Sequence, residues 1–502
     1  MRKWQVYLTG VIFLFLVMTA CSPTGANSNQ EGQASSEETF EFSIMATLHA
    51  PEAPNEKVLK EMEKAANVKL DIQWVPNTSY QDRLSTAFAT NTLPDAVFFG
   101  NQAIFNQFRD AMEDGQFWEI GPYLDEFENL SKLKDNILEN TKVNGKLYAL
   151  YQGVPLSRQG LIYRKDWADN LGLEAPKTTG DFLEMARAFT EDDPDQNGVD
   201  DTFGVADRSD LIYGAFKTVS SWFGTPNNWG EKDGQLLPEF MFDEYMQTMD
   251  FFKTMFENGY INQDFPVTSK TDQQEFLKNG TAGMYVGAIG DVGGLYTDAA
   301  TINSGVEFDV QNQIKGPDGE FGIWSVPGYG SALMFPKRSV ESEEELKQIL
   351  AFFDKMMTPE LSNLANWGIE GEHYEVVDGK ALPVNNKELT DREVKPYLSI
   401  LIGEAETRGS YELLRELEVV AKSAELIKDN ENYLIDDPTI PLYSQTQIRD
   451  GARLQQLITD ATYQYMIGQI DKTGFETAVE EWRSLGGDAI IEEYNASWQE
   501  MK

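Results

Sequence analysis

"TFEFSIMATL", residues 39–48, has the β-branched and aromatic composition of a strand. The segment at 54–68 (PNEKVLKEMEKAANV) places its apolar residues on one helical face, and 69–76 (KLDIQWVP) alternates like a second strand. A further helical pattern at 79–91 leads to a third, buried-looking strand at 93–100 (LPDAVFFG). Strands that alternate with helices indicate a sheet covered on both faces. The N-terminal part is therefore predicted to be α/β.

The pattern becomes helix-rich from about residue 160 onward. Thr178 is placed to cap a helix, with Asp181 three residues later as in a capping box. Residues 344–358 (EELKQILAFFDKMMT) form a clear amphipathic pattern, and 450–502 is helical almost throughout. The body of the chain, beyond the first 38 of its 502 residues, is too long for one ordinary core. Two or more lobes are expected.

The N-terminus has the features of an export signal. Arg2 and Lys3 precede an apolar run at residues 6–18, which is shorter than the roughly 20 residues of a membrane span. Small residues then lead to Cys21, the only cysteine, in a sequence that resembles a bacterial lipobox. We expect residues 1–20 to be a lipoprotein signal peptide and Cys21 to carry the lipid, including palmitate. The alternative is an ordinary signal peptide with an incidental cysteine.

Charge and composition narrow the range of partners. Residues 21–38 are polar and without large apolar side chains, which predicts a flexible tether. The formal net charge of −41 argues against nucleic acid, whose phosphates need a basic surface. It also argues against electrostatic binding of anionic lipids by a basic surface, so we expect the protein to be attached to the membrane through its N-terminal lipid alone. A single cysteine excludes an intrachain disulfide.

Three motifs, in this order and spacing, resemble the extracellular solute-binding proteins of carbohydrate ABC importers, family 1. The first is GKLYALYQGVPLSRQGLIYRKDWADNLGL at residues 145–173, with Gly-Lys-x-Tyr-Ala followed by a Tyr-x-Lys-Asp helix start. The second is FLKNGTAGMYVG at 276–287, and the third is GIEGEHYEVVDGK at 368–380. With the lipobox, the resemblance covers nearly all of the mature chain.

The resemblance implies a two-lobe, periplasmic-binding-protein-like (type II) α/β fold with a hinge and an interlobe ligand cleft. The first lobe is expected at 39–160 plus 306–360, and a helix-rich second lobe at 161–305 plus 361–502. The implied function is to capture a carbohydrate, expected to be an oligosaccharide, and to deliver it to the permease subunits of an ABC transporter. We expect a monomer, lipid-anchored on the extracellular face of the cell membrane of a Gram-positive bacterium.

Catalytic signatures are mostly absent, so we predict a binding protein and not an enzyme. The chain has neither G-x-S-x-G nor H-E-x-x-H, and its two histidines are too few for most histidine-based zinc sites. GYGSAL, residues 328–333, lacks the third glycine of a dinucleotide-binding loop and is interpreted as a turn. A glycosidase stays open as an alternative, since it needs only two carboxylates among the 82 acidic residues. A surface adhesin that holds glycan without import is another.

Sugar binding favours aromatic faces with polar groups at their rims. We select side chains near loops or after predicted strands, where open α/β sheets bind ligands. The candidates are His49, Asn101, Arg158, Trp222, Trp229, Trp324, Trp367, Glu370 and His373.

Each of these candidates has a structural alternative. Core packing is the alternative for any one tryptophan, although the turn residues around Trp222 and Trp229 favour the cleft. His373 is an equally plausible structural hydrogen-bonder. Arg158 either meets an acidic sugar or pairs with a surface acid; with Arg164 and Arg208 it would make a uronate possible. The expected ligand is a neutral or mildly acidic oligosaccharide.

DDPDQNGVDDTFG, residues 192–204, resembles an EF-hand-type calcium loop. Positions 1, 3, 5, 7 and 9 are occupied by Asp193, Asp195, Asn197, Val199 and Asp201, and Gly198 allows the sharp turn at position 6. Gly204 stands at position 12, where an EF-hand has a bidentate glutamate. Structural calcium is therefore predicted with weaker binding than a complete loop would give. A solvated acidic turn is the alternative.

Overall fold

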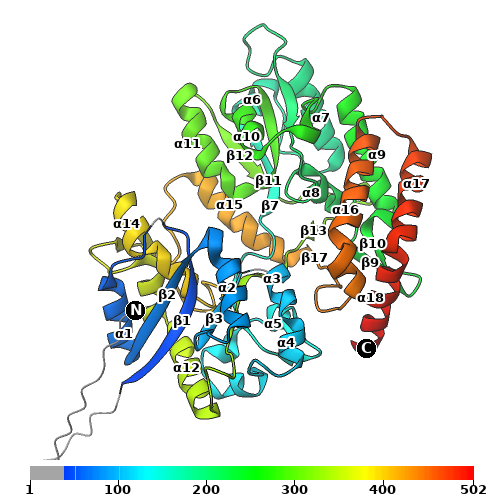
Figure 1. Ribbon diagram of the computed structural model, residues 1–502. Helices are drawn as coiled ribbons and strands as arrows, with labels where there is room; N and C mark the ends of the chain where they lie inside the picture. Colours follow the sequence, from blue (N-terminus) through cyan, green and yellow to red (C-terminus); the bar gives the residue numbers. More distant parts are fainter. Residues whose placement is uncertain (1–38, 51, 101, 502) are drawn as a thin grey trace, which may run out of the picture. The chain divides into compact units, whose positions relative to one another are not determined.

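Two separate β-sheets organise the chain, whose computed structural model describes residues 39–50, 52–100 and 102–501 (Figure 1). The first sheet consists of β2 (Val68–Pro76), β1 (Phe40–Leu48), β3 (Ala96–Phe99), β14 (Tyr329–Met334) and β6 (Leu150–Gly153), in this order. β1 pairs in parallel with β2 and with β3, whereas β14 is antiparallel to both β3 and β6. The three N-terminal strands predicted from the sequence are confirmed.

α1 (Glu56–Ala66) shows why the N-terminal residues fold as they do. Asn55 caps its start by accepting a hydrogen bond from the backbone N–H two residues later, at 3.1 Å. Asn67 ends the helix in the left-handed conformation, with φ of 57°. Val58 and Met62 are fully buried in the first hydrophobic core, together with the inward side chains of the sheet. The apolar face is the one that the sequence predicted, and the two caps define the ends of the helix.

The second sheet consists of β12 (Phe308–Gln311), β7 (Gln159–Arg164), β11 (Ala282–Ala288) and β8 (Phe203–Ala206), in this order. β7 is antiparallel to β11 and β12, and β11 is parallel to β8. Every residue of β7 is buried. Since a strand buried on both faces needs cover on both, the helices that pack around this sheet complete an α/β lobe.

Helices cover both sheets. With the first core lie α1, α2 (Tyr80–Ala89), α3 (Gln102–Gln107), α4 (Arg109–Glu113), α5 (Asp135–Glu139), α12 (Glu343–Met356), α13 (Pro359–Trp367) and α14 (Lys387–Glu393). With the second lie α6 (Lys165–Leu171), α7 (Thr179–Glu191), α8 (Ala215–Trp222), α9 (Asp243–Glu257), α10 (Lys270–Lys278), α11 (Val292–Ile302), α15 (Glu418–Asp429), α16 (Gln445–Met466), α17 (Lys472–Trp482) and α18 (Asp488–Met501). The capping box of Thr178 and Asp181 is present at the start of α7.

Four two-stranded ribbons complete the strands of the described residues. They are β4 (Lys142–Val143) with β5 (Lys146–Leu147), β9 (Trp229–Lys232) with β10 (Gln235–Pro238), β13 (Ile323–Trp324) with β17 (Leu434–Ile435), and β15 (Tyr374–Val377) with β16 (Lys380–Pro383).

The lobe bounds expected from the sequence stay a prediction, which the hydrophobic contacts would amend at two segments. β12 belongs to the second sheet, and Ile314 and Ile323 pack in the second core. Conversely, Leu361 and the segment ending at Ile402 pack in the first core. The sequence pattern could not show this, because the apolar residues of both segments would suit either core.

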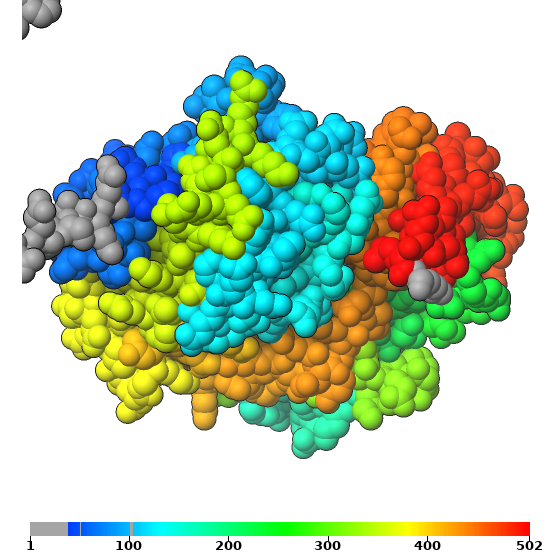
Figure 2. Space-filling model, turned by 90° about the horizontal axis from the view of Figure 1, so that it is seen from below, coloured from blue at the N-terminus to red at the C-terminus, as the bar shows by residue number. Residues whose placement is uncertain are grey.

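Three segments pass from one core to the other. They are residues 154–158 between β6 and β7, residues 325–328 between β13 and β14, and residues 403–417 between the first core and α15. In Figure 2 the orange surface of the chain around α15 lies between the yellow and cyan surfaces of the first core and the green of the second.

Two buried asparagines hold the backbone of these segments. Asn430 donates hydrogen bonds to Ser157 O at 3.3 Å and to Gln159 O at 2.9 Å. Asn227 donates to Ser325 O at 2.8 Å and to Ile435 O at 3.0 Å. Buried carbonyl groups need such partners, so each asparagine fixes the point where a crossing segment enters the second lobe.

One local prediction was wrong. GYGSAL was interpreted as a turn, but Tyr329–Met334 is strand β14, and only Gly328 has a positive φ, of 84°. The residues are paired on both sides by β3 and β6, which lie far away in sequence. This long-range pairing decides the conformation against the local glycine signal.

Several predictions lie outside the described residues. These are the signal peptide at 1–20, the lipidation of Cys21, the tether at 21–38 and the role of Asn101. Within the part of the chain that is described, no helix combines the length and apolar composition needed to cross a bilayer.

Candidate functional site

A cavity of about 490 Å³ lies where two of the crossing segments run side by side. We call it the first cavity; it is lined by residues 154–159, by Trp324, Val326, Pro327 and Tyr329, and by Tyr213. Cavities of this size hold small organic ligands. Its position between the two sheets makes both lobes contribute to its walls.

Aromatic rings form one wall of the first cavity. Tyr213 is 46% exposed, and its ring lies 5.7 Å from that of Trp324 at an interplanar angle of 61°. The indole Nε1 of Trp324 donates to Thr218 Oγ1 at 3.0 Å, which fixes the orientation of that ring. A fixed apolar wall of this kind suits the C–H face of a sugar.

Three residues that line this cavity carry a buried polar side-chain atom with no hydrogen-bond partner among the described residues. These atoms are Ser157 Oγ, Gln159 Oε1 and the hydroxyl of Tyr329. Burial also raises the pKa of Tyr329, so its hydroxyl keeps its proton and can donate. A buried polar group without a partner costs about 1–3 kcal/mol. A ligand that brings hydroxyl groups would recover this cost, which marks the cavity as a candidate binding site.

A second cavity, of about 580 Å³, lies on the other side of the first crossing segment. It shares Val154, Pro155 and Leu156 with the first cavity. Its other lining residues include Lys134, Gly153, Trp367, residues 404–406 and 408–413, Arg415 and part of α15. Trp367 is half-buried, and its Nε1 donates to Tyr411 O at 3.1 Å. The crossing segment is therefore a wall common to two cavities.

The structure brings only some of the predicted ligand residues to these cavities. Arg158 and Trp324 line the first cavity, and Trp367 lines the second. Arg158 is exposed. His49 is exposed after β1, and Glu370 is exposed in the turn before β15. Neither of these two lines a cavity described here.

Trp222 and Trp229 lie in the second core, which is the packing alternative. Trp222 is 1% exposed on α8 and packs edge-on against Phe182 at 5.7 Å. Trp229 is 8% exposed and packs edge-on against Tyr494 at 5.0 Å. Both partners are distant in sequence, so the flanking turn residues gave no indication of this packing.

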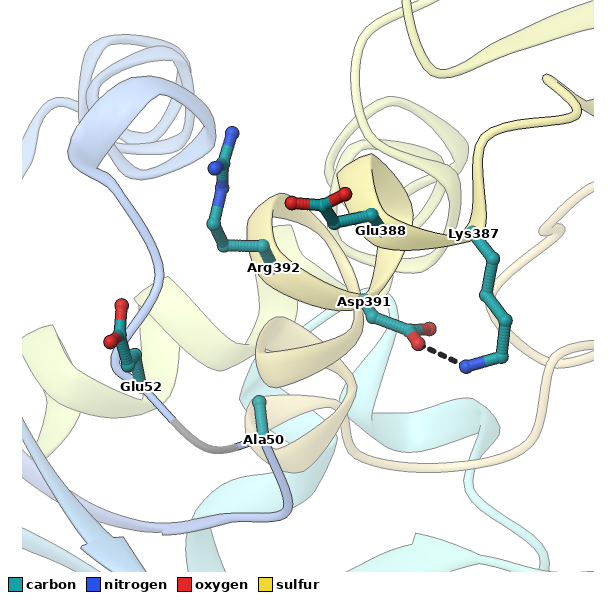
Figure 3. A pocket seen from close by; sticks show the side chains of 6 residues that line it. All are labelled: Ala50, Glu52, Lys387, Glu388, Asp391 and Arg392. Carbon is teal, nitrogen blue, oxygen red and sulfur yellow. Dashed lines mark hydrogen bonds and ion pairs between the residues drawn. The ribbon is translucent and has the colours of Figure 1, made fainter.

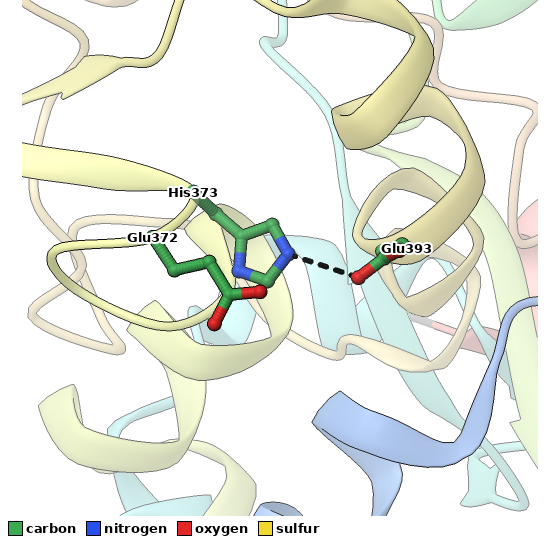
Figure 4. A group of neighbouring side chains, drawn as sticks. All are labelled: Glu372, His373 and Glu393. Atoms are coloured by element: carbon green, nitrogen blue, oxygen red, sulfur yellow. Dashed lines mark hydrogen bonds and ion pairs between the residues drawn. The ribbon is translucent and has the colours of Figure 1, made fainter.

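His373 is fully buried in a polar cluster with Glu372 and Glu393 (Figure 4). Its Nδ1 accepts a hydrogen bond from Ile369 N at 3.0 Å, so its proton is assigned to Nε2, which faces Glu393 Oε2 at 3.4 Å. One ligand atom from each of the three residues lies within 4.8 Å of the others.

This spacing would suit a metal, but hydrogen bonds already occupy the groups. Glu372 pairs with Lys57, and Glu393 with Arg392. Burial opposes the charge on Glu393, yet hydrogen bonds from Arg392, Asn55 and His373 hold the pKa of that carboxyl below its usual value. His373 is therefore a structural hydrogen-bonder in this arrangement.

A third pocket, of about 440 Å³, lies on the surface between the chain after β1 and α14 (Figure 3). It is lined by Ala50, Glu52, Lys387, Glu388, Asp391 and Arg392. Asp391 pairs with Lys387 and Lys395, and their hydrogen bonds lower the pKa of its carboxyl. No aromatic ring lines this pocket, so it lacks the flat apolar face that sugar binding favours.

Residues 192–204, the aspartate loop, fold around their own side chains. Asp193 accepts hydrogen bonds from Asn197 N and Gly198 N, each at 3.1 Å. The amide of Asn197 donates to Asp195 Oδ2 at 2.9 Å and to Asp201 Oδ1 at 3.3 Å. Four of the five predicted metal ligands thus gather their side chains in one place.

This donor set fits a calcium ion. Carboxylate and amide oxygens are the hard ligands that calcium prefers. Burial, followed by the neighbouring carboxylates of Asp193 and Asp201, raises the pKa of Asp195. The side chain of Val199 is 55% exposed and packs in no core, so its carbonyl is what this position has to offer. A cation bound here would relieve the repulsion among the carboxylates.

Comparison with known proteins gives consistent results. The sequence model of the family described as bacterial extracellular solute-binding protein matches residues 46–361. The polygalacturonan/rhamnogalacturonan-binding protein YtcQ of Bacillus subtilis (strain 168) is 42% identical over 509 residues, covering 100% of both chains. Lipoprotein LipO of the same organism is 33% identical, covering 100% of this chain and 99% of its own.

A solved structure supports the fold. The S. pneumoniae ABC-transporter substrate-binding protein FusA, as an EF-hand mutant in complex with fructo-nystose, is 20% identical to this chain. The match covers 92% of this chain and 100% of that one, with a TM-score of 0.64. The two-lobe binding-protein fold expected from the sequence is confirmed.

Proposed function

Because this chain belongs to the bacterial extracellular solute-binding proteins, we propose that it captures an oligosaccharide between its lobes and delivers it to an ABC importer. One observation carries the proposal most directly: the first cavity combines aromatic walls with three lining residues whose buried polar atoms lack a partner in the described part of the chain. Sugars offer the matching chemistry, apolar ring faces and many hydroxyl groups. The polysaccharide named for YtcQ supports carbohydrate as the ligand class.

Binding would be coupled to movement of the lobes. The three crossing segments are the natural hinge, and a ligand that contacts both lobes favours their closed arrangement by its differential affinity for it. Tyr213 comes from the loop after β8 in the second lobe, and Tyr329 begins β14 in the first. A sugar held between these two would supply that differential contact, and the permease subunits would recognise the closed form.

We propose binding without chemistry. YtcQ is named as a binding protein and FusA as a substrate-binding protein. The titratable side chain lining the first cavity, apart from its tyrosines, is Arg158, and glycoside hydrolysis needs a pair of carboxylates. An oligosaccharide that binds in the cavity should therefore be released without being cleaved.

The N-terminus would hold the protein at the membrane. Lipidation of Cys21, with palmitate among its acyl chains, is supported by the lipobox-like sequence and by the resemblance to Lipoprotein LipO. The protein would then be a monomer on the extracellular face of a Gram-positive cell, tethered by residues 21–38. Its membrane contact would be the lipid alone.

The aspartate loop would hold calcium through Asp193, Asp195, Asn197, Val199 and Asp201. The chelated ion would brace the junction between α7 and β8 and would take no part in sugar contact. The EF-hand mutant of FusA supports a loop of this kind in a protein of the same fold.

Titration of the mature protein with a panel of plant oligosaccharides tests the proposal. We expect heat release and thermal stabilisation by at least one sugar, which chromatography then recovers unchanged. New reducing ends would contradict a binding protein. Binding of long polymer alone, with no compaction in X-ray scattering on adding short sugars, would favour the adhesin.

A further inference from the structure

Arg408 differs from the other buried arginines in lacking an acidic partner. Four of the arginines that the structure describes are less than a tenth exposed. Three of them have a carboxylate oxygen close to the guanidinium: Arg109 with Glu113 at 3.1 Å, Arg164 with Asp166 at 2.6 Å, and Arg208 with Asp210 at 3.3 Å. Among the described residues, no carboxylate oxygen comes within 4.0 Å of the guanidinium of Arg408. A buried charge without a counter-charge is costly.

The protein contacts of Arg408 are all with neutral groups. Its Nε donates to Ser362 Oγ at 2.9 Å, and its Nη1 donates to Ile402 O at 2.8 Å and to Gly403 O at 2.6 Å. Burial lowers the pKa of Arg408 to about 10, so the guanidinium keeps its positive charge at neutral pH. These hydrogen bonds fix the orientation of the guanidinium group but do not neutralise its charge.

The second cavity is where a counter-charge has access to Arg408, which lines it. Arg415, also in the lining, donates Nη1 to Leu413 O at 3.3 Å and likewise has no carboxylate within 4.0 Å among the described residues. The two lining lysines are already paired, Lys134 with Glu431 and Lys428 with Glu412.

Glu404 is the acidic residue that acts electrostatically on Arg408. Its carboxylate oxygens form hydrogen bonds with other groups. Its Oε1 accepts from the hydroxyl of Tyr151 at 2.7 Å, and its Oε2 accepts from Thr407 Oγ1 at 2.8 Å. Glu404 still attracts the Arg408 charge over a longer distance. It does not form the short, bidentate contact that a guanidinium makes with a carboxylate.

The lining also contains five glutamates, and two of its aromatic residues suit a sugar ring. Trp367 and Tyr411 line the same cavity, and the indole of Trp367 is oriented by its hydrogen bond to Tyr411 O. An aromatic face next to an unpaired guanidinium is the combination that a sugar carrying a carboxylate requires. The volume of about 580 Å³ is within the range of ligand cavities.

We propose that the second cavity accepts a uronate unit of the ligand and that Arg408 pairs with its carboxylate. The inference rests on the proposed function, because it assumes an oligosaccharide ligand, and it extends that function by specifying an acidic sugar. Arg158, the arginine favoured by the sequence, lies on the other side of the common wall.

Calorimetric titration of the mature chain with trigalacturonate and with its methyl ester tests the proposal. The two ligands differ in the carboxylate charge and share the sugar backbone. We expect the acid to bind roughly tenfold to hundredfold more tightly than the ester, which corresponds to one charge-assisted contact. R408Q should weaken the binding of the acid far more than that of the ester and so remove this preference, and R408K should retain part of it.

R158Q is the matched control, because it removes an arginine from the first cavity only. It should keep the ratio of acid to ester affinity, whatever it does to the affinity itself. Thermal unfolding of each variant verifies that it is folded. If R408Q does not fold, R408K takes its place in the titration.

Three outcomes of the titrations with these two ligands would overturn the inference alone. They are equal binding of acid and ester by the unmodified chain, equal weakening of both by R408Q, and loss of the preference in R158Q. Binding of neutral oligosaccharides without trigalacturonate would also refute it and leave the proposed function intact. Failure to bind any sugar of the panel would refute both.

Discussion

The aspartate loop and the first cavity satisfy their polar groups in opposite ways. In the loop, Asp193 and Asn197 accept hydrogen bonds from the loop's own backbone, and the partly buried carboxylates of Asp193 and Asp195 lie near the exposed Asp201. In the cavity, Ser157, Gln159 and Tyr329 carry buried, neutral polar atoms without a protein partner. The loop is thus destabilised by repulsion between carboxylates, and the cavity region by polar groups without hydrogen bonds.

This difference indicates what each region needs from outside the protein. Crowded carboxylates are relieved by a cation, whereas buried hydroxyl and amide atoms are relieved by a ligand with hydrogen-bonding groups. Changes in the loop should therefore alter stability and leave sugar affinity unchanged. Changes in the cavity should alter affinity and leave calcium dependence unchanged. Each prediction below tests one half of this contrast.

Removal of calcium should have the largest effect. At a concentration 100 times its dissociation constant, a ligand specific for the folded state stabilises it by about 2.7 kcal/mol. We expect EGTA to lower the free energy of unfolding by about 2–3 kcal/mol and added calcium to restore it, as measured by denaturant titration. An unchanged unfolding curve, with no metal found by elemental analysis, would leave the loop as a solvated turn.

Asp195→Asn should abolish most of this calcium response. The substitution keeps the shape of the side chain and removes one carboxylate from the cluster, so the metal-free protein should be as stable as before or slightly more stable. Asp192→Asn is the control, because Asp192 pairs with Arg187 at 3.0 Å and stands outside the five predicted ligand positions. Calcium should still stabilise that variant; an equal loss in both would refute the assignment of Asp195.

Tyr329→Phe should change the free energy of unfolding by about 1 kcal/mol, and in the stabilising direction, since it removes a buried hydroxyl without a partner. The same change should weaken sugar binding by up to about tenfold in calorimetry, because a ligand hydrogen bond is lost.

Tyr151→Phe is the matched control for this variant. The Tyr151 hydroxyl accepts from Lys134 N at 2.8 Å and donates to Glu404 at 2.7 Å. Its removal should therefore destabilise the protein. If both variants moved stability in the same direction, the contrast between partnered and unpartnered hydroxyls would fail.

The smallest effect concerns pH. The raised pKa of Asp195 means that the metal-free folded state binds a proton more tightly than the unfolded chain. This contribution to stability is absent at neutral pH and appears as the pH falls through the raised pKa. Calcium competes with that proton, so stabilisation by calcium should shrink between about pH 7 and about pH 4. Melting temperatures with and without calcium measure it, and Asp195→Asn should weaken the trend.

Much of the fold could be predicted because local signals agreed with the final packing. The strand pattern of 39–48, the cap at Thr178 and the apolar stripe of 344–358 all correspond to elements of the structure. The prediction for GYGSAL was wrong because β14 depends on strands β3 and β6, which the local residues do not reveal.

The candidate site was less accessible from the sequence. Arg158 and Trp324 were identified because they stand near loops, but Ser157 and Gln159, one residue either side of Arg158, were missed. These two residues stand out because a buried side-chain atom of each has no hydrogen-bond partner among the described residues, and a sequence does not show this. The same holds for Arg408, since an unpaired arginine is recognised only when its whole surroundings are known.

The insertion of β14 between β3 and β6 has a consequence for how the chain folds. β3 ends at Phe99 and β14 begins at Tyr329, so the first sheet stays open until most of the chain has been made. The second sheet is complete between Gln159 and Gln311 and closes shorter loops. Since loop closure becomes more costly and slower with sequence separation, we expect the sheet whose first strand begins the described chain to be completed after the second sheet.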